Sequence, residues 1–225
     1  MAENTGSKER FATSEYNAKT FAISLTVLCL VGAAAWFGYV QIFTKGLERL
    51  PSKVCDGAVE RQVVIRALPR TRTAEDGASQ RHEGEDLMFS CHIYTSADSI
   101  LSGMTQVEDA SVQQWLNHYG ARTDGDTVRV SVDGAEALAE LDSTNGTSSV
   151  YIPCVPRGVR ADDANESYAI ITEASIIGHG RASGVALRQA VTDFAYQLTK
   201  HTYELAECRD PRVLPKELPR YKDRK

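Results

Sequence analysis

The chain of 225 residues lacks the short motifs that mark common catalytic and nucleotide-binding sites. It has no GxSxG nucleophile elbow, no HExxH zinc motif, no Walker-type phosphate loop and no GxGxxG dinucleotide motif. Its histidines are scattered without the spacing of metal ligands: His82, His92, His118, His179 and His201. The sequence therefore predicts no catalytic residues, no bound metal and no cofactor.

An excess of basic residues is also missing. The chain carries 25 Lys and Arg against 30 Asp and Glu, a net charge of -5. Residues 41–208 are acidic, whereas residues 209–225 are basic. Because phosphate backbones bind basic surfaces, the acidic body argues against nucleic acid as a partner. The basic segment is interrupted by prolines and poor in apolar residues, which predicts a disordered basic tail over 209–225.

Long apolar runs are limited to one, which begins at Phe21 and ends at Val40 without charge or proline. As a helix it is about 30 Å long, the thickness of the hydrocarbon core of a bilayer. The aromatic residues Trp36, Phe37 and Tyr39 near its end are typical of a membrane interface. We therefore predict a single transmembrane helix that contacts membrane lipid.

The predicted organisation is a short segment over 1–20, a transmembrane helix over 21–43 and one domain over 44–208 before the tail. A cleaved secretory signal peptide, with its cleavage site among the alanines at 33–35, is the alternative that the sequence leaves open.

Four cysteines follow the apolar run: Cys55, Cys91, Cys154 and Cys208. Their even number and wide spacing, with no CxxC pair, favour two disulfides in an oxidising compartment over a zinc site. Basic residues flank the apolar run equally, so the cysteines decide the orientation: N-terminus cytoplasmic and 44–208 extracytoplasmic at the cell membrane. Buried free thiols in a cytosolic body are the alternative.

Four cysteines allow three pairings, and the sequence alone does not choose among them. We favour pairing between neighbours, Cys55 with Cys91 and Cys154 with Cys208. The first bond would tie the opening helix of the domain to its first strand, and the second would tie the end of the last helix to the edge of a strand.

Hydrophobic periodicity predicts an α+β domain with a mostly antiparallel sheet packed by helices. Strands are expected over 87–95, 100–107, 127–132 and 149–153, with a central strand over 168–178 that is apolar on both faces. Helices are expected over 56–68, 109–119 and 183–207, the last with Ser183 as its N-cap. Residues 70–86 are predicted to be an exposed loop and 135–141 one or two helical turns.

The segment GHGRASG, between the central strand and the last helix, is the strongest candidate for ligand binding. Backbone N–H groups of Gly178, His179 and Gly180 at a helix N-terminus can approach an anion, and Arg181 adds positive charge. The alternative is a strand-to-helix turn that needs glycine for its geometry alone.

Several features near the C-terminus occur in a fixed order: Pro153-Cys154, a strand, the alanine-bearing helix that ends at Cys208, and Leu214-Pro215. In this order, and in its single predicted anchor, the chain resembles uncharacterised bitopic membrane proteins of actinobacteria. The resemblance covers about the last third of the chain. It implies a single-pass membrane protein with a disulfide-bonded ectodomain, and it implies no activity.

The sequence thus predicts a membrane-anchored extracytoplasmic interaction module without catalytic activity, whose partner is another envelope or membrane protein. A structural subunit of a membrane complex and an unrecognised envelope enzyme, with His179 and Arg181 near its pocket, are the alternatives.

Overall fold

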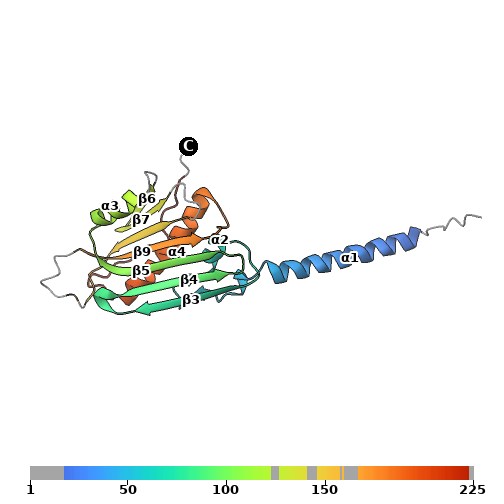
Figure 1. Ribbon diagram of the computed structural model, residues 1–225, viewed down its shortest axis with the longest axis horizontal. Coiled ribbons are helices and arrows are strands. Elements are labelled where there is room, and N and C mark those ends of the chain that lie inside the picture. The colour runs from blue at the N-terminus through green and yellow to red at the C-terminus, as the bar shows by residue number, and fades with distance from the viewer. Residues whose placement is uncertain (1–17, 123–126, 141–145, 158, 160–166, 223–225) are drawn as a thin grey trace, which may run out of the picture. The chain divides into compact units, whose positions relative to one another are not determined.

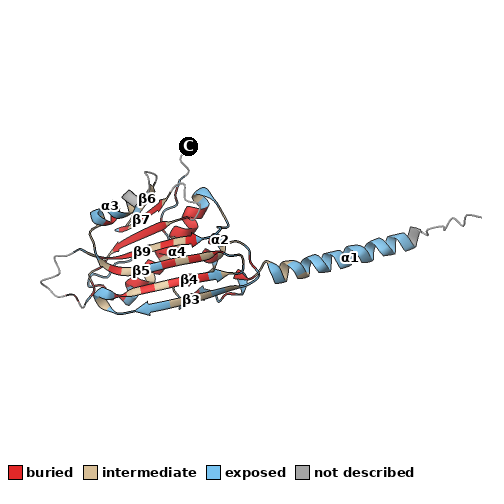
Figure 2. Ribbon diagram, viewed as in Figure 1, coloured by how far each residue is buried: buried red, intermediate tan, exposed pale blue. Residues whose placement is uncertain are grey.

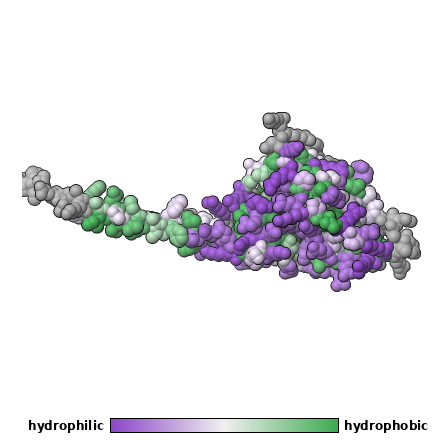
Figure 3. Space-filling view, turned by 180° about the vertical axis from the view of Figure 1, so that it is seen from behind, coloured by the Kyte–Doolittle hydropathy of each residue, from purple (hydrophilic) through white to green (hydrophobic). Residues whose placement is uncertain are grey.

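The computed structural model describes residues 18–122, 127–140, 146–157, 159 and 167–222. The chain divides into two compact units, Met1–Gln41 and Ile42–Lys225, which we call the anchor unit and the body. Helix α1 (Ala18–Phe43) provides the described part of the anchor unit. Its long apolar segment, Thr20–Phe43, has no buried residues in its most hydrophobic stretch, and Figure 3 shows it covered with hydrophobic side chains.

An α-helix satisfies its own backbone hydrogen bonds, so a helix of this length and composition can cross a membrane. Within the described ranges it is the one helix that meets these criteria. The predicted apolar helix is therefore confirmed. A signal sequence meets the same criteria, so the cleaved alternative stays open.

The body is built on a seven-stranded sheet with the order β3-β4-β5-β9-β8-β7-β6, in which all neighbours are antiparallel. The strands are β3 (Ala74–Arg81), β4 (Met88–Thr95), β5 (Ile100–Asp109), β6 (Thr127–Val132), β7 (Ala135–Glu140), β8 (Ser148–Pro153) and β9 (Tyr168–Ile177). The α+β prediction is confirmed. Strand β9, apolar on both faces, lies in the middle of the sheet as predicted, and Figure 2 shows that burial decreases toward the edge strand β3.

Helices α4 (Gly184–Leu205) and α2 (Arg61–Ala67) cover one face of the sheet (Figure 1). The stripe of α4 that carries Leu187, Val191, Phe194 and Leu198 is buried in the main core. Helix α3 (Val112–Arg122) covers part of the opposite face. Its Trp115 packs there with the buried residues Leu138, Tyr151, Ala169 and Ile171, which alternate along their strands with residues of the main core.

Helix α2 is shorter than the helix expected over 56–68. Cys55 and Asp56 take positive φ angles of 53° and 55°, so the chain turns there and forms the small hairpin of β1 (Lys53–Val54) and β2 (Val59–Glu60) before the helix begins. The 3-10 turns Leu47–Arg49 and Gly84–Asp86 complete the regular elements.

Both favoured disulfides are present, Cys55–Cys91 and Cys154–Cys208, with Cα atoms 5.6 Å and 5.3 Å apart. Strand periodicity explains the first bond, because Cys91 lies on the face of β4 that points into the core and is fully buried. The second bond closes the end of α4 onto the chain that follows β8. Cys29, in α1, is the remaining cysteine and is free.

Two local predictions were wrong. Residues 74–81, expected in a loop, form the edge strand β3, which pairs on one side and buries little, so that its polar composition is tolerated. Residues 135–140, expected as helical turns, form β7. The buried Ala135, Ala137 and Ala139 alternate with larger residues, and pairing with β6 and β8 outweighs the helix propensity of alanine.

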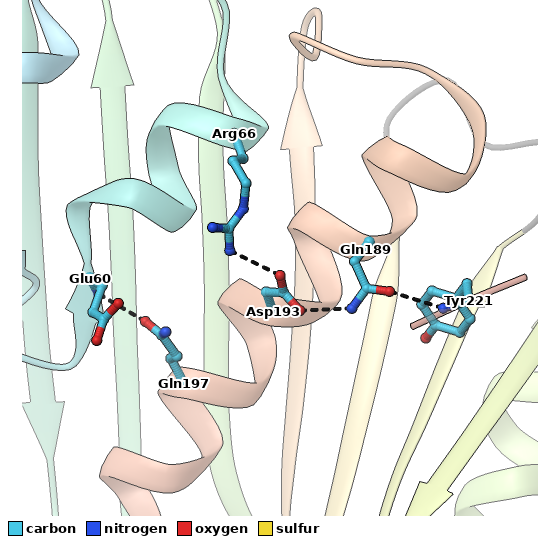
Figure 4. Close-up of polar contacts among 6 residues, drawn as sticks. All are labelled: Glu60, Arg66, Gln189, Asp193, Gln197 and Tyr221. Carbon is cyan, nitrogen blue, oxygen red and sulfur yellow. Dashed lines mark hydrogen bonds and ion pairs between the residues drawn. The ribbon is translucent and has the colours of Figure 1, made fainter. Parts of the chain in front are cut away.

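The prediction of a disordered tail was also wrong for residues 209–222. Leu218 is buried in the main core and Tyr221 is buried beside α4. The backbone N–H of Tyr221 donates to the side-chain oxygen of Gln189 (3.0 Å), and the Tyr196 hydroxyl donates to the carbonyl of Pro215 (2.7 Å). Figure 4 shows Tyr221 beside Gln189, which in turn contacts Asp193. A few apolar anchors therefore fix a segment whose average composition is polar.

Ser183 occupies the predicted N-cap position of α4, but its side chain makes no capping hydrogen bond. Two other polar contacts join α4 to α2 and to the end of β2. Arg66 forms an ion pair of 3.0 Å with Asp193, and the N–H of Glu60 donates to Gln197 at 2.8 Å (Figure 4).

Candidate interaction surface

Beside α3, no other described helix covers the sheet face that β4, β5 and β9 share. On this side the outward residues of β4, β5 and β9 form three rows that run across the strands. The rows are Tyr94–Ile100–Ile177, His92–Ser102–Ser175 and Ser90–Met104–Glu173. We call these nine residues the open face.

The first row of the open face is apolar and accessible. Tyr94 and Ile177 are 50% and 56% exposed, and Ile100 lies between them as the directly opposed residue of β5. Directly opposed side chains on neighbouring antiparallel strands touch, so the three form one continuous strip. Met104, 42% exposed, adds a further apolar side chain in the third row, four residues along β5 from Ile100. Large apolar side chains at such exposure on adjacent strands are uncommon unless they are covered in the working protein.

The second row is polar. The Ser102 hydroxyl and Nδ1 of His92 lie 3.1 Å apart, within hydrogen-bonding distance. The His92 ring also lies near that of Tyr94, with centroids 6.1 Å apart, so the imidazole separates the apolar strip from the serines. Within the described ranges no carboxylate bonds to His92. It therefore lacks the acid that orients the histidine of a Ser-His-Asp triad.

The third row joins the open face to a hollow beneath α3. The Tyr119 hydroxyl of α3 donates to the carboxylate of Glu173. The hollow has a volume of about 240 Å³ and is bordered by Tyr119, Leu138, Glu140, Ser149 and Glu173, among others. The buried indole N–H of Trp115 donates to the Ser149 hydroxyl at 2.9 Å and so holds α3 against this part of the sheet. Glu173 therefore belongs to both the open face and the hollow.

A second hollow, of about 230 Å³, lies on the helix side of the body and is lined by charged residues of both signs, including Lys53, Glu60 and Lys216. His201 and Glu204 of α4 contribute to it. The His201 ring packs edge-on against Phe89, with centroids 4.9 Å apart. Burial lowers the pKa of His201, partly opposed by the negative charges of Glu204 and Asp56. Within the described residues no group of three His, Cys, Asp or Glu side chains could hold a metal ion.

The structure places Gly178, His179, Gly180 and Arg181 in the turn between β9 and α4, as expected. Several of their polar groups already have protein partners. The N–H and guanidinium of Arg181 donate to the carbonyls of Ala67 and Ile65, and the N–H of His179 donates to the Ser99 hydroxyl. These bonds tie α2 and the β4–β5 turn to the start of α4. Anion binding by this turn stays a prediction.

The glycine at 178 has a clear geometric cause. Its φ is +91°, and a Cβ atom there would lie 2.4 Å from the carbonyl oxygen of Asp98. Because the two backbone segments approach this closely, the turn needs glycine at position 178 whether or not it binds a ligand.

Comparison of the chain with protein-family models, curated proteins and solved structures finds no match. The fold and its surfaces therefore carry the functional argument, and the resemblance to bitopic proteins of actinobacteria stays a prediction.

Part of the open face can be read from the sequence. The alternation in β4 places Ser90, His92 and Tyr94 on one side of the strand, opposite Cys91. Which residues of β5 and β9 lie beside them depends on the register between strands distant in sequence, and no short motif encodes it.

Proposed function

We propose that the protein is a membrane-tethered binding module whose body recognises another protein of the cell envelope through the open face. The observation that carries this proposal is the exposed apolar strip of Tyr94, Ile100 and Ile177 beside a polar row. Protein interfaces combine an aromatic or aliphatic anchor with a surrounding polar rim that excludes water.

The shape of the surface supports a protein partner over a small ligand. The open face is the surface of three paired strands, whereas small molecules are held in concave sites that surround most of their area. The adjoining hollow beneath α3 is small and opens to solvent, and it suits a single side chain of a partner. Among the described residues no carboxylate bonds to His92, whereas a hydrolytic triad needs an acid that orients the histidine.

The setting is also part of the proposal. We place the N-terminus in the cytoplasm, α1 in the membrane and the body on the outer side, where both disulfides are stable. Thiol alkylation of the denatured full chain tests this. Without reductant, only Cys29 of the 5 cysteines should be labelled, and reduction should expose the other four. Labelling of all five without reductant would contradict an oxidising compartment.

Site-specific photo-crosslinking on intact cells tests the binding surface. A photoreactive side chain at position 94 or 177 should give the same discrete adduct, whereas one at the exposed Glu204, on the helix side, should not. The substitution Ile177→Asp should reduce the adduct at position 94 at least tenfold, because it places a charge in the strip while its half-exposed position leaves the core intact. Equal adducts from positions 94 and 204, or no effect of Ile177→Asp, would refute the open face as the binding site.

A further inference from the structure

Strand β3 is the edge strand of the sheet next to β4, and its outer backbone edge has no partner strand among the described elements (Figure 1). The N–H of Ser96 donates to the carbonyl of Thr73. Every second residue from Thr73 onward, beginning with Glu75, therefore directs its backbone N–H and carbonyl toward β4. The residues between them direct these groups toward the free edge of the sheet: Ala74, Asp76, Ala78 and Gln80. The edge thus offers a row of free donors and acceptors over eight residues without a proline.

The edge carries two free charges. Glu75 and Arg81 are exposed and lie on the same side of the sheet, and neither makes an ion pair or hydrogen bond with another described residue. The third charged residue, Asp76, is already engaged, because its carboxylate accepts the backbone N–H of Cys55 at 2.7 Å. Charged residues on an edge usually prevent pairing with other strands. Here the positions of the two charges favour pairing with one kind of strand, which carries opposite charges at the matching positions.

We propose that the partner of this edge is a second copy of the chain, paired antiparallel through β3 about a two-fold axis at Ala78. Such an axis runs normal to the sheet and keeps each face on the same side, so every residue lies opposite a residue whose side chain is on the same face of the sheet. Among such registers, only those centred on Gly77 or Ala78 pair seven of the eight residues of β3. The register centred on Ala78 places Glu75 of each copy directly opposite Arg81 of the other.

The backbone geometry agrees with this register. Ala78 directs its N–H and carbonyl outward, so the two Ala78 residues form a hydrogen-bonded pair at the axis. The Glu75–Arg81 pairs then fall at non-hydrogen-bonded positions, where opposed Cα atoms approach to about 4.5 Å and side chains lie closest. In the register centred on Gly77, Glu75 opposes Ser79 instead and neither charge is compensated.

Pairing through β3 joins two seven-stranded sheets into one continuous sheet. Because the axis is normal to the sheet, both open faces lie on the same side. The Tyr94 row of each copy continues through its Glu75 to Arg81 and Met88 of the other copy. The dimer therefore presents a surface twice as wide to a partner. Its formation does not depend on whether the open face binds a protein.

Charge reversal of the full chain in detergent micelles tests the proposal, with the association state measured by analytical ultracentrifugation. The wild type should be a dimer, and Glu75→Arg or Arg81→Glu alone should weaken association at least about tenfold, because each creates two like-charge pairs. An equimolar mixture of the two single variants should dimerise again, since one copy carries two positive and the other two negative charges at these sites. Glu204→Arg, which changes the net charge equally but lies on α4, should dimerise as the wild type does.

Gln80→Pro provides a second, charge-independent variant. It removes an outward N–H at a position that does not bond to β4, so the body should keep its fold while dimers are lost. Near-ultraviolet circular dichroism verifies that fold. A monomeric wild type, dimers that persist in either single charge variant, or a mixture that stays monomeric would each overturn the proposal.

Discussion

Removal of the Cys154–Cys208 disulfide should cost the body about 4 kcal/mol of stability. The bond closes a loop with a sequence separation of 54 residues. In the chain-entropy model a loop of this length stabilises by about 4 kcal/mol at room temperature, because it restricts the unfolded chain. The Cys55–Cys91 bond closes a separation of 36 residues and should contribute only a few tenths of a kcal/mol less.

The matched perturbations are the double variants Cys154→Ala/Cys208→Ala and Cys55→Ala/Cys91→Ala, compared with Cys29→Ala as a control that touches neither bond. Guanidinium unfolding of the full chain in micelles, followed by the emission of Trp115 in a Trp36→Phe background, gives the free energies of unfolding. Trp115 is buried, so its emission reports the packing of α3 on the sheet. A loss below about 1 kcal/mol for either pair would refute the reasoning that the bonds act on a disordered unfolded state.

Three further outcomes are expected. Burial lowers the pKa of His201, so as the pH falls below about 6.5 the unfolded chain binds a proton that the folded chain resists, and stability falls. His201→Gln should flatten this pH dependence in urea unfolding midpoints. Gly103→Ala should cost about 1–3 kcal/mol in thermal unfolding, because its Cβ would lie 2.4 Å from Leu198 and 2.7 Å from Phe194, whereas Gly77→Ala, which meets nothing within 4 Å, should be near neutral; equal effects would contradict the packing. Burial raises the pKa of Tyr196 and of Tyr221 to about 12, so absorbance at alkaline pH should show phenols that ionise well above the ordinary pKa of about 10 in the folded protein, and Tyr221→Phe should remove one of them.

Helices and strands whose own hydrophobic pattern shows which face is buried could be predicted from the sequence. Strand β4 alternates strictly between buried and accessible residues, and α4 carries a continuous apolar stripe, so local periodicity sufficed for both. The disulfide pairing was chosen because the paired cysteines are neighbours in sequence, and the alternation in β4 explains only why Cys91 faces the core.

Elements that depend on distant partners were missed. Strand β3 has the composition of a loop, and it is a strand because β4 offers it a pairing edge. The alanines of β7 favour a helix in isolation, and the neighbouring strands decide otherwise. In the tail, Leu218 and Tyr221 are two apolar side chains among many polar ones, and only the shape of α4 gives them a place to bind.

The same cause hid the open face. Each of its rows combines residues from three strands, and β9 lies far from β4 and β5 in sequence. Sequence reasoning instead selected the glycine-rich turn at Gly178, whose residues are adjacent in the chain. The bonds of Arg181 and His179 to protein atoms are tertiary contacts that no local pattern contains.

The seating of the C-terminal segment affects how the molecule can be handled. The Tyr221 hydroxyl lies 3.2 Å from that of Thr192, inside the body. A label inserted between Pro215 and Tyr221 will therefore disturb contacts within the body. A shortened variant that stops before Leu218 will lose two buried side chains and leave Gln189 and Thr192 without the partner that Tyr221 provides.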